Sequence, residues 1–251
     1  MKVSLFITCL TDLYAPTVGM AVVKTLEHFG CEVDFPADQT CCGQPAFNNG
    51  YPEHARDLAR RMIEVFKKSD YIVTPSGSCC AMIRDHYPHL FADDEVRQPE
   101  ALEFVGRTYE FIEFLTKILK VDLTAYRLPE PVDFTYHYTC HLRGLEMTGD
   151  PCINLLRQIG NCRFVPLEKA EQCCGFGGTF ATKYPDISGA IVRDKVQCGN
   201  RTRAHVMIVN DGGCAMNIGG AGHRYGSTFA VRHAAELIAA ALEGGQDNAR
   251  R

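Results

Sequence analysis

The sequence predicts an α/β fold made of two similar βαβ-type halves, each with a small, mainly parallel sheet. Two observations predict it. One pattern of cysteines occurs twice along the chain, in the same order and at nearly the same intervals. Short apolar segments also alternate with longer helix-periodic stretches in both copies, and this alternation is typical of parallel sheets. We therefore interpret the chain as an internal duplication.

The repeated pattern is a single cysteine, a Cys-Cys-Gly triplet and a last cysteine. In the first half, 31 residues separate Cys9 from the triplet 41–43, and 36 lie between Cys42 and Cys79. In the second half, 32 residues separate Cys140 from the triplet 173–175, and 39 lie between Cys174 and Cys214. A shuffled chain of this composition should contain about 0.05 such triplets, so two at matching places favour duplication over chance.

Each half is expected to contain three buried strands, because three of its segments are short, apolar and rich in β-branched or aromatic residues. These segments are 4–9, 30–36 and 71–75, then 134–140, 161–166 and 206–210. The stretch His54–Phe66 has its apolar side chains on one helical face. Helices are also expected at Tyr109–Leu119 and Ala234–Leu242, where they close the two halves.

Paired prolines in the stretch Leu128–Pro131 favour an extended linker between the halves, since proline stops helices. We therefore place one cysteine-rich domain at residues 1–128 and a second at residues 129–251.

Composition excludes several classes of function. The net charge of -4 and the absence of a basic patch argue against a nucleic-acid partner. No segment approaches the roughly 20 apolar residues that a membrane span needs. The apolar start of the chain is too short for a signal peptide, and Asp12 follows it without a cleavage site. We expect a cytoplasmic protein, in which 13 cysteines indicate metal-binding or redox chemistry rather than disulfides.

Two groups of four thiols are expected at the carboxyl ends of the strands, where ligands gather in parallel sheets. Soft thiolates select zinc, copper(I) or iron–sulfur clusters. Adjacent cysteines point opposite ways in extended chain, so they suit a multi-iron cluster better than one ion. Gly43 and Gly175 would let the backbone turn tightly beside such a cluster. The first group comprises Cys9, Cys41, Cys42 and Cys79, and the second comprises Cys140, Cys173, Cys174 and Cys214.

These motifs carry a resemblance to a known family over nearly the whole chain. The segments 41–46, 75–79, 173–180 and 216–220 resemble those of the CCG cysteine-rich domain family, especially its lactate-utilization members. That family includes the heterodisulfide reductase B subunit and cluster subunits of glycolate and glycerol-3-phosphate oxidation. In the heterodisulfide reductase relatives the last element is Cys-x-x-Cys, whereas here Ser76 and Asp211 replace its first cysteine. Four thiolates per site suit a [4Fe–4S] cluster rather than the five-thiolate site of those relatives.

The resemblance implies an iron–sulfur electron-transfer subunit of a complex that oxidises L-lactate to pyruvate. It implies one or two clusters per chain, held by the eight repeat cysteines. The implied partners are a ferredoxin-type iron–sulfur subunit and a third small subunit. The sequence shows no flavin or nicotinamide fingerprint, so we do not expect this chain to catalyse the oxidation alone.

Two other functions stay open. The first is a zinc-stabilised interaction module without redox chemistry. The second is a thiol–disulfide enzyme, which is disfavoured because no Cys-x-x-Cys redox motif is present. We further expect the segments Cys79–Ile83 and Met216–Gly220 to line one exposed face with the Cys-Cys-Gly loops. The alternative is that both segments begin helices and pack into their own domains.

Several residues near the pattern have two interpretations. His137 and His141 could hydrogen-bond a cluster or transfer protons, but we favour satisfied polar histidines at a sheet edge. Asp211 could be a ligand or could hold a turn, and Ser76 is expected to hold the matching turn. The remaining cysteines are expected to pack in the interior or lie on helices; they are Cys31, Cys80, Cys152, Cys162 and Cys198.

Overall fold

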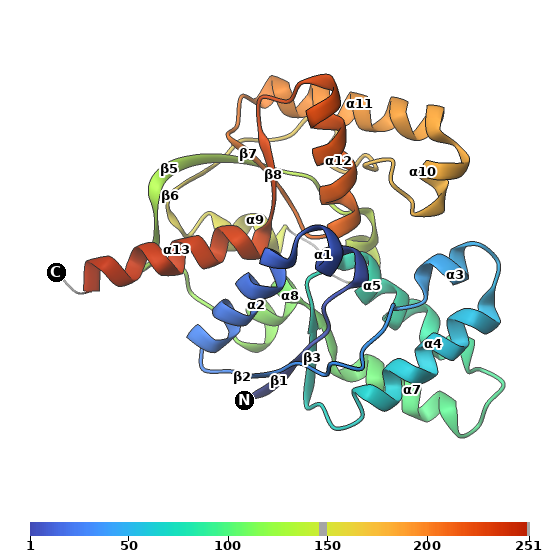
Figure 1. Cartoon of the computed structure of the whole chain (residues 1–251). Coiled ribbons are helices and arrows are strands. Elements are labelled where there is room, and N and C mark those ends of the chain that lie inside the picture. The colour runs from blue at the N-terminus through green and yellow to red at the C-terminus, as the bar shows by residue number, and fades with distance from the viewer. Residues whose placement is uncertain (146–149, 250–251) are drawn as a thin grey trace.

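The computed structural model describes residues 1–145 and 150–249. The second predicted domain also contains residues 146–149 and 250–251, which lie outside the described residues. The chain forms two four-stranded sheets in which every neighbouring pair of strands is parallel (Figure 1). Their strand orders are β2-β1-β3-β4 and β6-β5-β7-β8, so one topology occurs twice. The predicted fold class and internal duplication are confirmed.

The first half contains strands β1 (Lys2–Leu5), β2 (Glu32–Asp34), β3 (Tyr71–Thr74) and β4 (Thr108–Glu110). Its longer helices are α2 (Pro16–His28), α4 (Pro52–Val65) and α7 (Arg97–Arg107). Its shorter helices are α1 (Cys9–Tyr14), α3 (Gln44–Asn48), α5 (Gly77–Ala81), α6 (Tyr87–Leu90) and α8 (Phe111–Glu113). Two π-helical turns complete it, η1 (Met82–His86) and η2 (Phe114–Ile118).

The second half contains strands β5 (Arg127–Tyr136), β6 (Gly160–Phe164), β7 (Val206–Val209) and β8 (Ala230–His233). Its longer helices are α11 (Pro185–Thr202), α12 (Gly212–Tyr225) and α13 (Ala234–Ala249). Its shorter elements are the 3₁₀ helix η3 (Cys140–Leu145), α9 (Pro151–Leu156) and α10 (Thr179–Lys183).

Helix α4 illustrates how local sequence specifies these elements. Proline at its first position costs no hydrogen bond there and presets the helical φ angle. Ala55, Ala59, Met62 and Ile63 then recur at helical spacing and are all buried. The predicted helix 54–66 is therefore confirmed, with its start two residues earlier.

Each sheet has a fourth strand that the sequence analysis did not identify. Strand β4 is only three residues long, and two of them, Thr108 and Glu110, are buried polar residues, so no apolar run marks it. The predicted helix Tyr109–Leu119 is consequently wrong at its start, because Tyr109 and Glu110 belong to β4 and the helix begins at Phe111. Strand β8 is an edge strand in which exposed and half-buried residues interrupt the apolar pattern.

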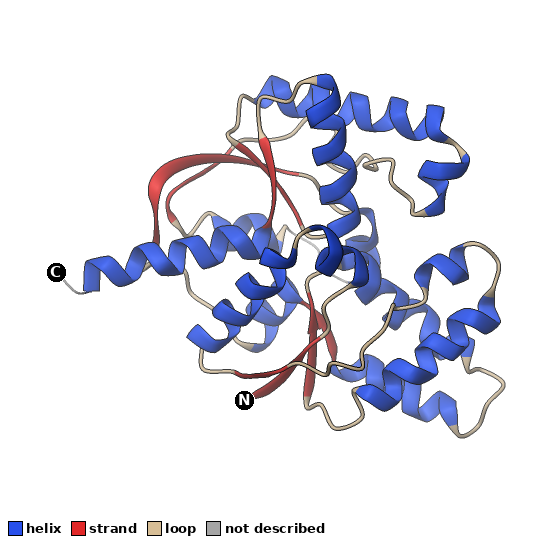
Figure 2. Cartoon of the chain, viewed as in Figure 1, coloured by secondary structure: helices blue, strands red, loops and turns tan. Residues whose placement is uncertain are grey.

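The two halves share one hydrophobic core. This core includes Val3 and Leu26 from the first half together with Phe134 and Leu242 from the second. Helices α2 and α13 pack against each other between the two sheets (Figure 2). At their surface, Lys24 forms an ion pair with Glu243 at 2.7 Å. The halves therefore form one packed body, with a further core on the outer side of each sheet.

The segment expected to be a linker is part of a strand. Residues 128–131 lie in β5, and the register between β5 and β6 shifts between Arg127 and Val132. Proline is tolerated where a ladder is irregular, because no N–H is required there. The division of the chain at residue 128 stays a prediction.

Among the described residues, no helix combines the length and apolar character that crossing a membrane would require.

Candidate metal centre

All eight repeat cysteines line one cavity of ≈ 410 Å³. Both groups lie at the carboxyl ends of the strands, as expected for parallel sheets. Because the halves are packed together, the first and second cysteine groups face the same space. The sequence predicted two groups, and the single shared cavity follows from how the halves pack.

The first cysteine group is joined by sulfur–sulfur contacts. Cys9 starts α1, Cys41 and Cys42 lie in the loop before α3, and Cys79 lies in α5. The Sγ atoms of Cys42 and Cys79 are 3.2 Å apart. Hydrogen bonds from the thiols of Cys42 and Cys9 lower the pKa of Cys41 to about 3. Donating to Cys41 correspondingly raises the pKa values of the thiols of Cys9 and Cys42.

The second cysteine group repeats this arrangement. The Sγ atoms of Cys174 and Cys214 are 3.3 Å apart. Hydrogen bonds from the thiols of Cys140 and Cys174 lower the pKa of Cys173 to about 2. The pKa values of Cys140 and Cys174 are raised, chiefly because both thiols donate to Cys173. In both groups the pKa is thus lowered at the first cysteine of the triplet and raised at the two thiols that donate to it.

The glycine of each triplet shapes the turn around that thiolate. Gly43 and Gly175 have φ angles of +89° and +87°, a conformation that other residues rarely adopt. This turn directs the Gly43 N–H to Cys41 Sγ at 3.5 Å and the Gly175 N–H to Cys173 Sγ at 3.3 Å. A Cβ on Gly175 would lie only 2.8 Å from the carbonyl oxygen of Ser188. Glycine is therefore required for the turn and for close packing on α11.

Ser76 and Asp211 link the two cysteine groups. Asp211 caps α12, where its Oδ1 accepts from the N–H groups of Gly213 at 3.0 Å and Cys214 at 3.4 Å. Its Oδ2 accepts from the Ser76 hydroxyl at 2.9 Å and the Ser78 N–H at 3.0 Å. Ser76 caps α5 and accepts from the N–H of the first-group residue Cys79 at 3.3 Å. With both oxygens of Asp211 occupied, this geometry favours the turn-holding interpretation over ligation.

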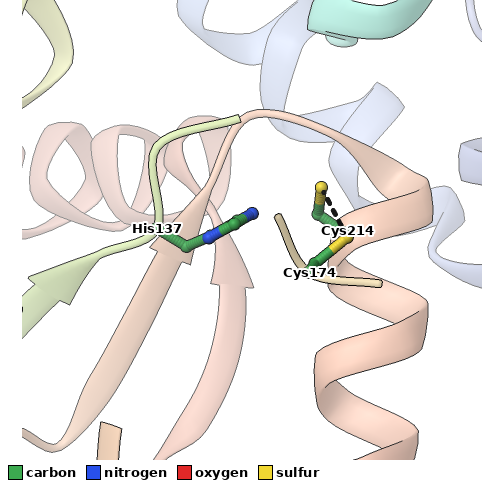
Figure 3. Close-up of side chains that lie close together, drawn as sticks. All are labelled: His137, Cys174 and Cys214. Atoms are coloured by element: carbon green, nitrogen blue, oxygen red, sulfur yellow. Dashed lines mark hydrogen bonds between the residues drawn. The ribbon is translucent and has the colours of Figure 1, made fainter. Parts of the chain in front are cut away.

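His137 differs from the interpretation that we favoured. It follows β5 and is 1% exposed, yet neither ring nitrogen has a hydrogen-bond partner among the described residues. Its ring points toward the sulfurs of Cys174 and Cys214 (Figure 3). The expectation of a satisfied polar histidine is therefore wrong here. His141, by contrast, is exposed, and its Nδ1 lies 3.6 Å from Cys140 Sγ.

The five other cysteines lie outside both groups, as expected. Cys31 is buried in the shared core, and Cys162 is half-buried against it. Cys80, Cys152 and Cys198 are almost fully buried. Their positions agree with packing roles, and none of the five lines the cavity.

The expected exposed face is only partly present. Cys80, Ala81, Met82 and Ile83 are buried in the first half, because α5 and η1 pack inward. In the second half, residues 216–220 belong to α12; of these five, Ile218 is buried, Gly220 is exposed and the other three are half-buried. The alternative, that both segments begin helices and pack into their own domains, describes the first segment, whereas the second is mostly half-buried.

Two buried polar contacts were not predicted from the sequence. Lys195 on α11 is fully buried, and its Nζ donates to the carbonyl oxygens of Lys169 at 2.5 Å and Ala170 at 3.3 Å. Glu110 of the first half accepts from Asn210 Nδ2 of the second at 3.1 Å in a buried contact. Aligning the two halves residue by residue would have identified Lys195, which occupies the place of Met62. The contact between the halves has no local sequence signal.

The chain belongs to the CCG family, because the sequence model of that family, described as "Cysteine-rich domain", matches residues 3–84 and again residues 134–219. Each matched region contains one of the two cysteine groups.

Among curated proteins, this chain is similar to lactate utilization protein A of Bacillus licheniformis. The two are 45% identical over 238 residues, which cover 95% of this chain and 99% of the relative. The protein of the same name from Geobacillus thermodenitrificans is 44% identical over 238 residues, covering 95% and 98%.

Among solved structures, a hypothetical protein from Helicobacter pylori matches with a TM-score of 0.61 and 11% identity. The match covers 96% of this chain, which spans 49% of that protein's length. At this identity the likeness shows the fold alone.

Proposed function

We propose that this chain is an iron–sulfur electron-transfer subunit of a multi-subunit oxidoreductase that oxidises L-lactate to pyruvate. The observation that carries the proposal is the pair of four-thiol groups on one cavity. Soft thiolates in such numbers suit iron–sulfur clusters. The substrate follows from the relatives, which are named lactate utilization protein A.

The donor set fits such a group. Each half offers four thiols, of which one already has a strongly lowered pKa and three lie within the same hydrogen-bonded network. The ligands would be the eight repeat cysteines, four for each cluster, with one or two [4Fe–4S] clusters per chain. A bound cluster would accept and release single electrons. The N–H groups of Gly43 and Gly175 would remain directed at its sulfur ligands.

The chain needs partners in this role. Oxidation of L-lactate to pyruvate releases two electrons and two protons, and the sequence carries no flavin or nicotinamide fingerprint to receive a hydride. We propose that this chain conducts electrons within a cytoplasmic complex. A ferredoxin-type iron–sulfur subunit would pass electrons onward, and a third small subunit would complete the assembly.

One observation favours a second candidate, a zinc-stabilised interaction module. The closest thiol pairs are 3.2 and 3.3 Å apart. Two thiolates on one tetrahedral zinc ion lie about 3.8 Å apart, given Zn–S bonds of about 2.3 Å. Thiolates on different irons of a cluster lie farther apart, since the irons are themselves separated. The observed spacing is therefore nearer to that of a single ion, and cluster binding would require these side chains to spread.

Electron flow in the assembled complex tests the proposed role. We would replace Cys174 with serine, because oxygen is a poorer ligand for a soft site. The matched control is Cys162→Ser, at a half-buried cysteine outside both groups. Cys174→Ser should stop lactate-dependent reduction of an external acceptor, whereas Cys162→Ser should retain it. Unchanged electron flow in Cys174→Ser, or lactate oxidation by the isolated chain at an enzymic rate, would rule out this role.

A further inference from the structure

The two cysteine groups are not equivalent, because His137 accompanies only the second. A ring nitrogen of His137 and the Sγ atoms of Cys174 and Cys214 all lie within 4.8 Å of one another. The ring extends from the end of β5 toward the two sulfurs (Figure 3). Nitrogen and sulfur donors this close to one another can bind one metal ion.

The duplication supplies the comparison for this position. Three residues before the first cysteine of each group stand Phe6 and His137. Phe6 donates its N–H to the Val73 carbonyl oxygen at 2.9 Å, and His137 donates to that of Ile208 at 3.0 Å. The two side chains therefore occupy the same place in the fold. Phe6 is fully buried and packs edge-on against another phenylalanine, so this place is apolar in the first half.

A buried imidazole ring at this position lowers the stability of the fold unless its nitrogen atoms have a binding partner. Its two nitrogens are buried without hydrogen bonds among the described residues, and burial of unpartnered polar atoms destabilises a fold. Phenylalanine would avoid that cost, as Phe6 does.

A second polar replacement accompanies the first. Lys195 stands ten residues after the proline that begins α11, and Met62 stands ten residues after the proline that begins α4. Both side chains are fully buried. The Lys195 ammonium group interacts electrostatically with Cys173 and Cys174. At these two matched positions the second half therefore has a nitrogen-bearing side chain where the first half has an apolar one, and the Lys195 ammonium group donates to backbone carbonyl oxygens.

We propose that His137 is a nitrogen ligand of the metal group held by the second cysteine group, alongside Cys174 and Cys214. The chain then has one all-sulfur site and one mixed nitrogen–sulfur site. The nature of the group, an iron–sulfur cluster, rests on the proposed function.

Pulsed EPR of the complete chain, purified without oxygen and labelled with ¹⁵N-histidine, tests the ligand. The reduced second site should show the strong hyperfine coupling of a directly bound nitrogen. His137→Phe, which copies the residue of the first half, should abolish that coupling. The matched control His141→Gln, at the exposed histidine beside Cys140, should leave the coupling unchanged. His137→Gln, with circular dichroism, checks that a loss is not caused by misfolding.

The outcomes separate this inference from the proposed function. If clusters are present but the nitrogen coupling is weak, as for a hydrogen bond, or survives in His137→Phe, the ligand assignment is overturned and the proposed function stands. If the chain contains zinc and no iron, the proposed function fails, and cobalt(II) becomes the probe. A visible cobalt spectrum that differs between wild type and His137→Phe would support ligation by His137, and identical spectra would overturn it.

Discussion

Asp211→Ala should destabilise the metal-free chain, because it removes the N-cap of α12 and the hydrogen bonds that link the two cysteine groups. Asp211 accepts four hydrogen bonds from both halves of the chain. Loss of an N-cap costs about 1 kcal/mol. The buried Ser76 hydroxyl and the Ser78 N–H also lose their acceptor, at about 1–3 kcal/mol for an unsatisfied buried group. We expect a loss of about 2–4 kcal/mol in the free energy of unfolding.

Urea unfolding under a reductant, followed by far-ultraviolet circular dichroism, measures this loss. Asp211→Asn is the matched control, because asparagine is an equally good N-cap but presents one oxygen where aspartate presents two. It should cost roughly half as much. Loss of the helix cap alone should cost at least about 0.5 kcal/mol. A smaller loss in the free energy of unfolding for Asp211→Ala would therefore refute the bridging role. Unchanged stability together with loss of metal from the second site would instead identify Asp211 as a ligand.

Three further predictions concern the turn, a buried carboxyl and the thiol pair. Gly175→Ala should cost about 1–3 kcal/mol because of its positive φ, whereas Gly189→Ala, where a Cβ meets nothing within 4 Å, should not destabilise in urea titrations. Burial raises the pKa of Glu110 to about 7, so its contribution to stability is present below its unfolded pKa and is lost as the pH rises to about 7. Between pH 5 and pH 7, the free energy of unfolding of Glu110→Gln should therefore rise by about 2 kcal/mol relative to that of wild type. Parallel stability profiles of the two proteins would contradict this. Air oxidation of the metal-free chain should link Cys42 to Cys79, whose sulfurs are 3.2 Å apart, and peptide mapping without reductant should detect that disulfide before any other.

The fold was predictable where local sequence carries strong signals. Apolar segments at or just before single cysteines marked β1, β3, β5 and β7, and helical periodicity marked α4 and α13. Strands β4 and β8 could not be predicted, because they are short edge strands without an apolar run. Their residues become strand only through pairing with β3 and β7, which is a tertiary effect.

The convergence of each cysteine group was predictable, because the ends of parallel strands meet at one edge. The shared cavity was not, since it depends on how α2 and α13 pack the halves together. The hydrogen bonding of His137 could not be predicted from the sequence either. Whether a histidine near a strand end finds a hydrogen-bond partner depends on neighbours from distant segments, here Cys174 and Cys214.

The metal content of the anaerobically purified chain tests the central claim most directly. Iron, acid-labile sulfide and zinc are measured per chain, together with the visible absorption spectrum. Air must be excluded, because freed thiolates oxidise and exposed clusters are lost. The account predicts a brown protein with iron and sulfide in equal amounts and little zinc, since eight thiolates suit iron–sulfur clusters. A colourless protein that carries one zinc per half, even after anaerobic reconstitution with iron and sulfide, would contradict it.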